Sequence, residues 1–86
     1  MNWDEASFKE KIESQHQFPG PYTFKFIAPQ DQKESLQDLV PGGKISYRNS
    51  SGNKYVSATI QAVMQNSAEV IEVYEKAHFI KGIVAL

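Results

Sequence analysis

The sequence predicts an α+β domain of the ferredoxin-like class, a βαββαβ sandwich in which two helices cover one face of an antiparallel four-stranded sheet. A short additional helix precedes this unit. Three observations support the fold: an aromatic strand follows a proline-rich break, two strands flank a linker typical of a hairpin, and each half of the unit contains a helical pattern. Right-handed crossovers put both helices on the same side of the sheet, so the other sheet face is left open.

The first strand is expected to begin at about Tyr22. Two prolines fix φ and withhold backbone N–H groups, so no helix can run through the segment Phe18–Pro21. The aromatic and β-branched residues that follow, as far as Ile27, fit a pleated surface. The chain therefore divides into an N-terminal helical arm, residues 1–17, and the ferredoxin-like domain, residues 18–86.

Three helices are predicted from one repeated local pattern, an Asn or Asp followed three residues later by Glu. The first side chain can accept hydrogen bonds from the free N–H groups of the first turn, while the Glu reaches back and favours the positive helix end. The pairs are Asn2 and Glu5, Asp31 and Glu34, and Asn66 and Glu69. The corresponding helices are expected over about Trp3 to Gln15, Asp31 to Leu39 and Ser67 to Ala77.

The third of these helices has the clearest amphipathic pattern. One stripe is apolar and the opposite side is charged, as expected for a helix that packs on a sheet. The apolar stripe consists of Val70, Ile71, Tyr74 and Ala77. The second helix is short and ends at Pro41–Gly43, and the first has a thin stripe of Phe8 and Ile12.

Two further strands are predicted over Lys44–Arg48 and Lys54–Met64. The linker at residues 49–53 is rich in residues that tolerate a positive φ, so the two strands are interpreted as an antiparallel hairpin. Apolar and polar residues alternate along the second of them, which indicates one buried and one wetter face. The last apolar segment, Phe79–Leu86, is too short for a helix and is expected to form the fourth strand.

The chain resembles the YbeD-like family of unknown function, also known as domain of unknown function 493. The resemblance is carried by the Phe-Pro pair and Lys-containing strand of Phe18–Ile27, the Gly-Asn-Lys-Tyr turn within Ser51–Thr59, and the apolar C-terminal run Ile80–Leu86. It implies a ferredoxin-like fold comparable to ACT regulatory domains, in a small bacterial protein of the cytoplasm with a regulatory role. The resemblance supplies no active site.

Two positions depart from the pattern of that family. Ala28–Pro29 stands where a Gly would end the first strand, and Asn53 is inserted before the Lys of the hairpin turn. A ligand site of the ACT kind depends on close backbone approach in the first of these loops, which Gly permits. We therefore expect no binding of free amino acids of the ACT kind.

Composition restricts the function further. The chain has 86 residues, no cysteine, nine basic and ten acidic side chains, and a formal charge of −1. This balance argues against a general electrostatic grip on nucleic acid, and the absence of any long apolar run argues against a membrane span. The N-terminal residues lack the apolar region of a secretion signal, so a cytoplasmic protein is expected.

No motif indicates catalysis, a cofactor or a metal. Pro41–Ser46 contains Gly-Gly-Lys, but Asp38 occupies the position of the first Gly of a phosphate-binding loop and a strand follows, so we interpret it as a helix stop. His16 and His78 are far apart, with no carboxylate at ligand spacing. We expect a non-enzymatic protein without cofactors.

The open sheet face is the candidate interaction surface. Alternation assigns to it a basic set in contrast to the acidic helical side, and the candidate residues are Lys25, Lys44, Arg48, Thr59 and Lys81. The same alternation adds Thr23, Ile27, Ser46, Ser57, Gln61 and Ile83. The hypothesis is a regulatory or protein-interaction module that binds an unknown protein partner or a second copy of itself.

Two alternatives stay open at this stage. The face can be a merely solvated surface whose charges confer solubility, or it can bind nucleic acid. Gly52, Tyr55 and Val56 match the third-strand signature of the RNA-recognition motif, but Asn53 and Ala58 stand where stacking rings belong.

Overall fold

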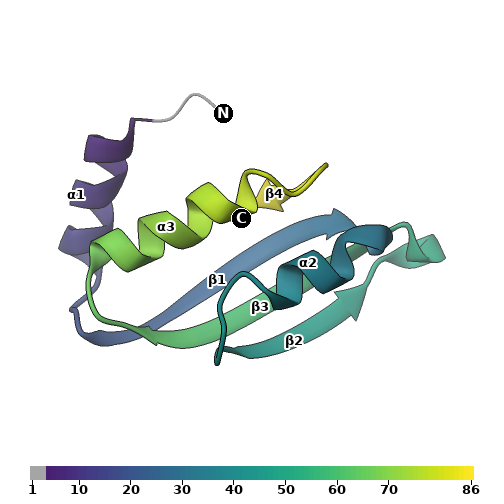
Figure 1. Cartoon of the computed structure of the whole chain (residues 1–86), viewed down its shortest axis with the longest axis horizontal. Helices are drawn as coiled ribbons and strands as arrows, with labels where there is room; N and C mark the ends of the chain where they lie inside the picture. The colour runs from purple at the N-terminus through teal and green to yellow at the C-terminus, as the bar shows by residue number, and fades with distance from the viewer. Residues whose placement is uncertain (1–3) are drawn as a thin grey trace.

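The computed structural model describes residues 4–86 and confirms the ferredoxin-like arrangement. Four strands form one antiparallel sheet in the order β2-β3-β1-β4. Two helices lie over one face of it, and a third stands at the end of the sheet against α3 (Figure 1). The elements are α1 Glu5–Gln15, β1 Gly20–Pro29, α2 Lys33–Gln37, β2 Lys44–Asn49, β3 Tyr55–Met64, α3 Ser67–Ala77 and β4 Val84–Ala85.

The register of the long strands decides which side chains share a face. Lys25 lies opposite Thr59, and Thr59 lies opposite Ser46 on its other side, so these three form one row across β1, β3 and β2. The next row joins Ile27, Ser57 and Arg48 in the same way. Because side chains alternate along a strand, both rows project to the same side of the sheet.

The opposite side of the sheet carries an aromatic core. Phe24 and Phe26 on β1 are fully buried, and their rings stack with centroids 6.2 Å apart. The ring of Tyr74 on α3 lies 5.5 Å from Phe24 and 5.7 Å from Phe26. Val70, the first member of the predicted stripe on α3, is also fully buried, which confirms the face assigned to that helix.

The cap expected at α3 is present. Asn66 Oδ1 accepts from the backbone N–H of Glu69 at 3.0 Å, and Glu69 Oε1 accepts from the N–H of Gln65 at 2.6 Å. Both side chains thus satisfy backbone groups that the helix itself leaves free. This arrangement fixes the point at which β3 ends and α3 begins.

The prediction that Asp31 and Glu34 cap the second helix was wrong. A 3₁₀ turn, Gln30–Gln32, precedes α2, and no side chain forms a capping hydrogen bond at the start of either segment. The reason is the length of β1, which continues as far as Pro29, so that Asp31 lies inside the first turn instead of ahead of it. The helix is also shorter than the predicted range of about Asp31 to Leu39, since α2 covers only Lys33–Gln37.

The first helix is capped by Asp4, whose Oδ1 accepts from the N–H groups of Ala6 at 3.1 Å and Ser7 at 3.3 Å. A hydrogen bond from the Ser7 hydroxyl and the backbone N–H groups lower the pKa of this carboxyl. The predicted cap Asn2 and the predicted start at Trp3 lie outside the described residues.

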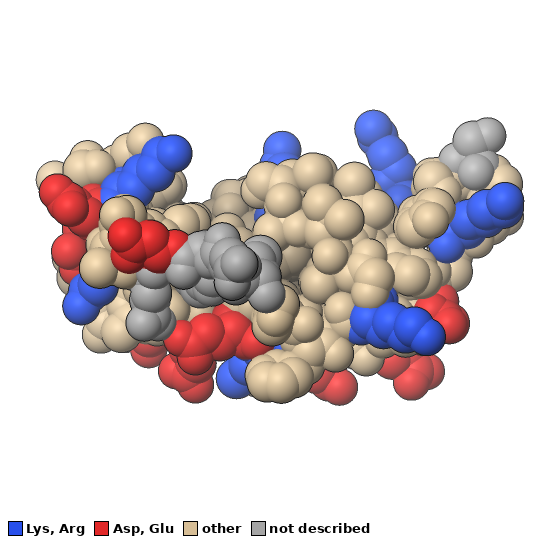
Figure 2. Space-filling model, turned by 90° about the horizontal axis from the view of Figure 1, so that it is seen from above, with Lys and Arg blue, Asp and Glu red and all other residues tan. Residues whose placement is uncertain are grey.

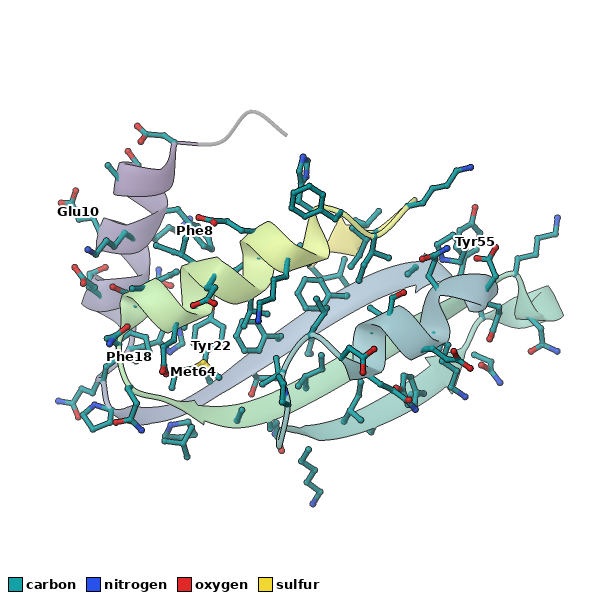
Figure 3. The ribbon with its side chains drawn as sticks, viewed as in Figure 1. Phe8, Glu10, Phe18, Tyr22, Tyr55 and Met64 are labelled. Carbon is teal, nitrogen blue, oxygen red and sulfur yellow. The ribbon has the colours of Figure 1, made fainter. Side chains whose placement is uncertain are left out.

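The inner side of α1 joins the core. Ile12 is 3% exposed. Phe8 points from α1 toward α3 (Figure 3), and its ring lies edge-on to that of Tyr74 with centroids 5.2 Å apart. Ser67 at the start of α3 donates its hydroxyl proton to Glu13 Oε2 at 2.7 Å. These contacts fix α1 to α3.

The fourth strand is much shorter than predicted, and its alternation is reversed. Residues 79–83 form turns, with Gly82 at a φ of +76°, so that only Val84 and Ala85 pair with β1. Val84 lies opposite Ile27 and therefore faces the open side of the sheet, whereas Ile83 packs against the core. The placement of Ile83 and Lys81 on the open face was therefore wrong.

Candidate binding site on the open sheet face

The open face combines basic, hydroxyl and apolar side chains from all four strands. We use the term open face for the side of the sheet that α2 and α3 do not cover. Four of the five predicted interaction residues, Lys25, Lys44, Arg48 and Thr59, occupy strand positions that project to this side. Their three basic side chains are exposed. The fifth, Lys81, lies in the turn before β4 and outside the sheet.

A hollow of about 420 Å³ lies on this face. We call it the sheet hollow and define it by its solvent-facing side chains, Lys25, Ser46, Arg48, Ser57, Thr59 and Leu86. Phe26, Tyr47 and Ala58 also border it, but alternation directs their side chains to the core face. Lys44 lies opposite Gln61, in the row on the other side of that of Lys25, Thr59 and Ser46, and does not line the hollow.

The two cations of the sheet hollow stand on either side of its hydroxyl groups. Lys25 is on β1 and Arg48 on β2, with β3 between them, and they belong to adjacent rows. Strand spacing and residue rise place their Cα atoms about 12 Å apart. Lys and Arg have long flexible stems, so both charged ends can reach a group seated over Ser57 and Thr59 on β3.

No carboxylate side chain balances these cations. None of the side chains that line the hollow is acidic. Within residues 4–86 the one ion pair is that of Lys76 with Glu72 at 3.9 Å, which lies on α3. In Figure 2 the acidic side chains gather mainly along the side of the helices, and several basic side chains project from the opposite side. Among the side chains that line the sheet hollow, two are basic and none is acidic.

A second large depression lies between α1 and α3 and measures about 510 Å³. It is lined by Lys9, Glu72 and Glu75 together with small or apolar residues, so it presents charges of both signs. A surface of this kind does not select for the charge of a ligand. The sheet hollow is therefore the better candidate, although it is smaller.

The other residues considered from the sequence do not form a site. His16 packs against the ring of Tyr22 at 4.7 Å, while His78 follows the last turn of α3. Gly43 sits where a Cβ atom would come within 3.0 Å of Ile60, which supports the interpretation of the Gly-Gly-Lys segment as a packed turn. Among the described residues no group of three or more potential metal ligands occurs.

None of the helices within residues 4–86 combines the length and the apolar character needed to cross a membrane.

One protein-family model matches most of this chain. Residues 13–85 match the family described as "Protein of unknown function (DUF493)". The chain belongs to this family. The match covers every strand of the sheet and all the residues of the sheet hollow except Leu86. No match was found among curated proteins or among solved structures. The DUF493 membership agrees with the resemblance found in the sequence and leaves the function to be argued from the site.

Sequence reasoning missed two residues of the open face, Val84 and Leu86. They are 53% and 68% exposed, which is unusual for large apolar side chains. The available signal in the sequence was Gly82, because a glycine inside an apolar run is typical of a turn or bulge, after which the strand would begin.

Proposed function

We propose that this DUF493 protein is a non-enzymatic interaction module that binds an acidic segment of a partner protein on its open face. The observation that carries the proposal is the sheet hollow, where Lys25 and Arg48 flank three hydroxyl groups and no carboxylate side chain is present. An oxyanion gains charge-assisted hydrogen bonds from such donors, and these are the strong ones in proteins.

A protein partner accounts for the face better than a nucleic acid. Binding to single-stranded RNA or DNA uses rings on which bases stack, and the exposed positions around the hollow are hydroxyl, basic and aliphatic. Tyr55, an exposed ring at the first residue of β3, lies two positions from Ser57 on the same side of the sheet but does not line the hollow (Figure 3). The formal charge of −1 also gives little general attraction to a phosphate backbone.

A regulatory role fits the same features. Binding of a charged segment is a way to respond to the state of a partner.

The experiment is a fluorescence-anisotropy titration of a labelled Glu-rich peptide and a labelled oligouridylate of the same length, at low and at moderate salt. We expect the peptide to bind more tightly than the RNA, and the double variant Lys25→Glu/Arg48→Glu to weaken it about tenfold or more. The matched control is Lys9→Glu/Lys81→Glu, which makes the same change in net charge away from the open face.

Two results would contradict the proposal. Tighter binding of the oligouridylate with a steep salt dependence would favour the nucleic-acid alternative. Equal losses in the two double variants would mean that net charge alone governs binding, in which case the open face is only a solvated surface.

A further inference from the structure

We propose that the sheet hollow recognises a phosphoserine or phosphothreonine in the partner segment, an inference that rests on the proposed function and specifies its ligand. The protein would then distinguish the phosphorylated partner from the unmodified one. The proposal follows from the number of donors in the hollow, from their directions and from the apolar surface beside them.

The donors outnumber the acceptors of a carboxylate. The hollow holds the ammonium of Lys25, the guanidinium of Arg48 and the hydroxyl groups of Ser46, Ser57 and Thr59. A phosphoryl group has three terminal oxygens and a charge of about −1.5 to −2 at neutral pH, whereas a carboxylate has two oxygens and one charge. Two cations and three hydroxyl groups suit the charge and the larger number of acceptor oxygens of a phosphoryl group better than those of a carboxylate.

The donors also reach the site from different directions. Lys25 comes from β1, Arg48 and Ser46 come from β2, and the hydroxyl groups of β3 lie between them. A tetrahedral phosphoryl group can accept from opposite sides and from below at once, while a planar carboxylate accepts mainly within its plane. The planar fork of Arg48 can bind two phosphoryl oxygens together, as it can the two oxygens of a carboxylate.

An apolar shelf beside the hollow argues for a peptide as the source of the phosphoryl group. Leu86 lies at the edge of the hollow, and Val84 faces the same side of the sheet next to Ile27. This shelf lies about 10 Å, two strand spacings, from the β3 hydroxyl groups, a distance that about three residues of extended chain can span. Free phosphate would leave the shelf exposed, whereas a peptide with an apolar residue near its phosphorylated residue covers it.

The experiment compares three immobilised degenerate peptide libraries that differ at one fixed central position, which is phosphoserine, serine or glutamate. An oligouridylate serves as the nucleic-acid arm. Protein retained on each support is quantified for the wild type, Lys25→Ala, Arg48→Lys and the matched control Lys81→Ala. Circular dichroism of each variant verifies that it is folded.

We expect at least about tenfold more retention on the phosphoserine library than on the serine library, and about tenfold losses for Lys25→Ala. Arg48→Lys keeps the charge but removes the fork, which binds two oxygens of a carboxylate as well as of a phosphoryl group, so it should lower retention on both the phosphoserine and the glutamate libraries. Lys81→Ala should behave as the wild type. With each peptide sequence on its own bead, sequencing of the peptides on the beads that retain most protein should show apolar residues two to three positions from the phosphoserine, as about 10 Å of extended chain requires.

The pH dependence separates a phosphoryl group from a carboxylate. The second pKa of a phosphate monoester is about 6, so retention on phosphoserine should fall between about pH 7.5 and about pH 5.5 as the group loses one charge. Glutamate keeps its charge over this range because its pKa is about 4.3.

Failure of this inference can be told from failure of the proposed function. Equal retention on the glutamate and phosphoserine libraries, with losses in Lys25→Ala, would overturn the phosphoryl assignment but keep the acidic-segment module. Equal retention on the phosphoserine and serine libraries would overturn the inference as well. Retention on the oligouridylate support alone would overturn both.

Discussion

Replacement of Phe24 by Ala tests the core on which the open face depends. Phe24 is 0% exposed, and its ring lies 4.7 Å from that of Tyr22, 6.2 Å from that of Phe26 and 5.5 Å from that of Tyr74. Removal of a ring from such a site costs about 3–5 kcal/mol, the lost transfer free energy plus the cavity left behind. At about 0.05–0.15 kcal/mol per residue, the whole domain is stable by only about 4–13 kcal/mol.

The assay is chemical denaturation followed by circular dichroism. We expect Phe24→Ala to lower the free energy of unfolding by about 3 kcal/mol or more and the melting temperature by at least about 12 °C. Phe24→Leu, which keeps most of the apolar volume, should lose less and still give a measurable transition if the Ala variant does not fold. Thr23→Ala, the exposed neighbour on the open face, should stay within about 0.5 kcal/mol of the wild type. Equal effects at Thr23 and Phe24 would refute the assignment of the two sheet faces.

Four further outcomes are expected. Ile71→Ala should cost about 2–5 kcal/mol in urea denaturation, because Ile71 is 5% exposed on α3, and an unchanged midpoint would contradict its place in the core. Asn66→Ala should cost about 1 kcal/mol through loss of the α3 cap, while Asn66→Asp should retain most of the melting temperature. Tyr47→Phe should be neutral or stabilising by about 1 kcal/mol, since the Tyr47 hydroxyl is buried without a hydrogen-bond partner among the described residues, and a clear loss of stability would reveal a partner. Burial, followed by the hydrogen bond with Tyr22, raises the pKa of Tyr74 above its usual value of 10.0. The contribution of Tyr74 to the free energy of unfolding should therefore be constant below about pH 10 and fall above it, and a Tyr74→Phe variant whose stability falls equally above about pH 10 would contradict this origin.

The fold could be predicted from the sequence because, in the long elements, the local sequence patterns agree with the observed strand pairing. The proline break, the alternation of β3 and the stripe of α3 each lie within continuous segments, and the register of β1 with β3 follows from which residues must be buried. Lys25, Lys44, Arg48 and Thr59 could therefore be assigned to one face before the structure was known.

The prediction was wrong where tertiary contacts decide the local structure. Phe79–Leu86 is apolar enough for a strand, but the turns around Gly82 leave only Val84 and Ala85 in β4. A Cβ atom at Gly82 would come within 3.0 Å of the Pro29 ring. No pattern in the segment itself indicates that contact, because Pro29 lies far away in the sequence. For the same reason the sequence could not show that Lys25 and Arg48 border one hollow, or that Leu86 lies at its edge.

The brevity of β4 has a consequence for how a bound ligand can be detected. Only two residue pairs and the hydrogen bond from the Leu86 N–H to the Lys25 carbonyl, 2.9 Å long, attach this strand to β1. Local opening free energies follow the number of such attachments, so the amide proton of Leu86 should exchange with solvent much faster than those of β3. A segment that covers Leu86 and Val84 would hold the strand closed and slow this exchange. Hydrogen exchange at one backbone amide would thus report occupancy of the sheet hollow without a label on either molecule.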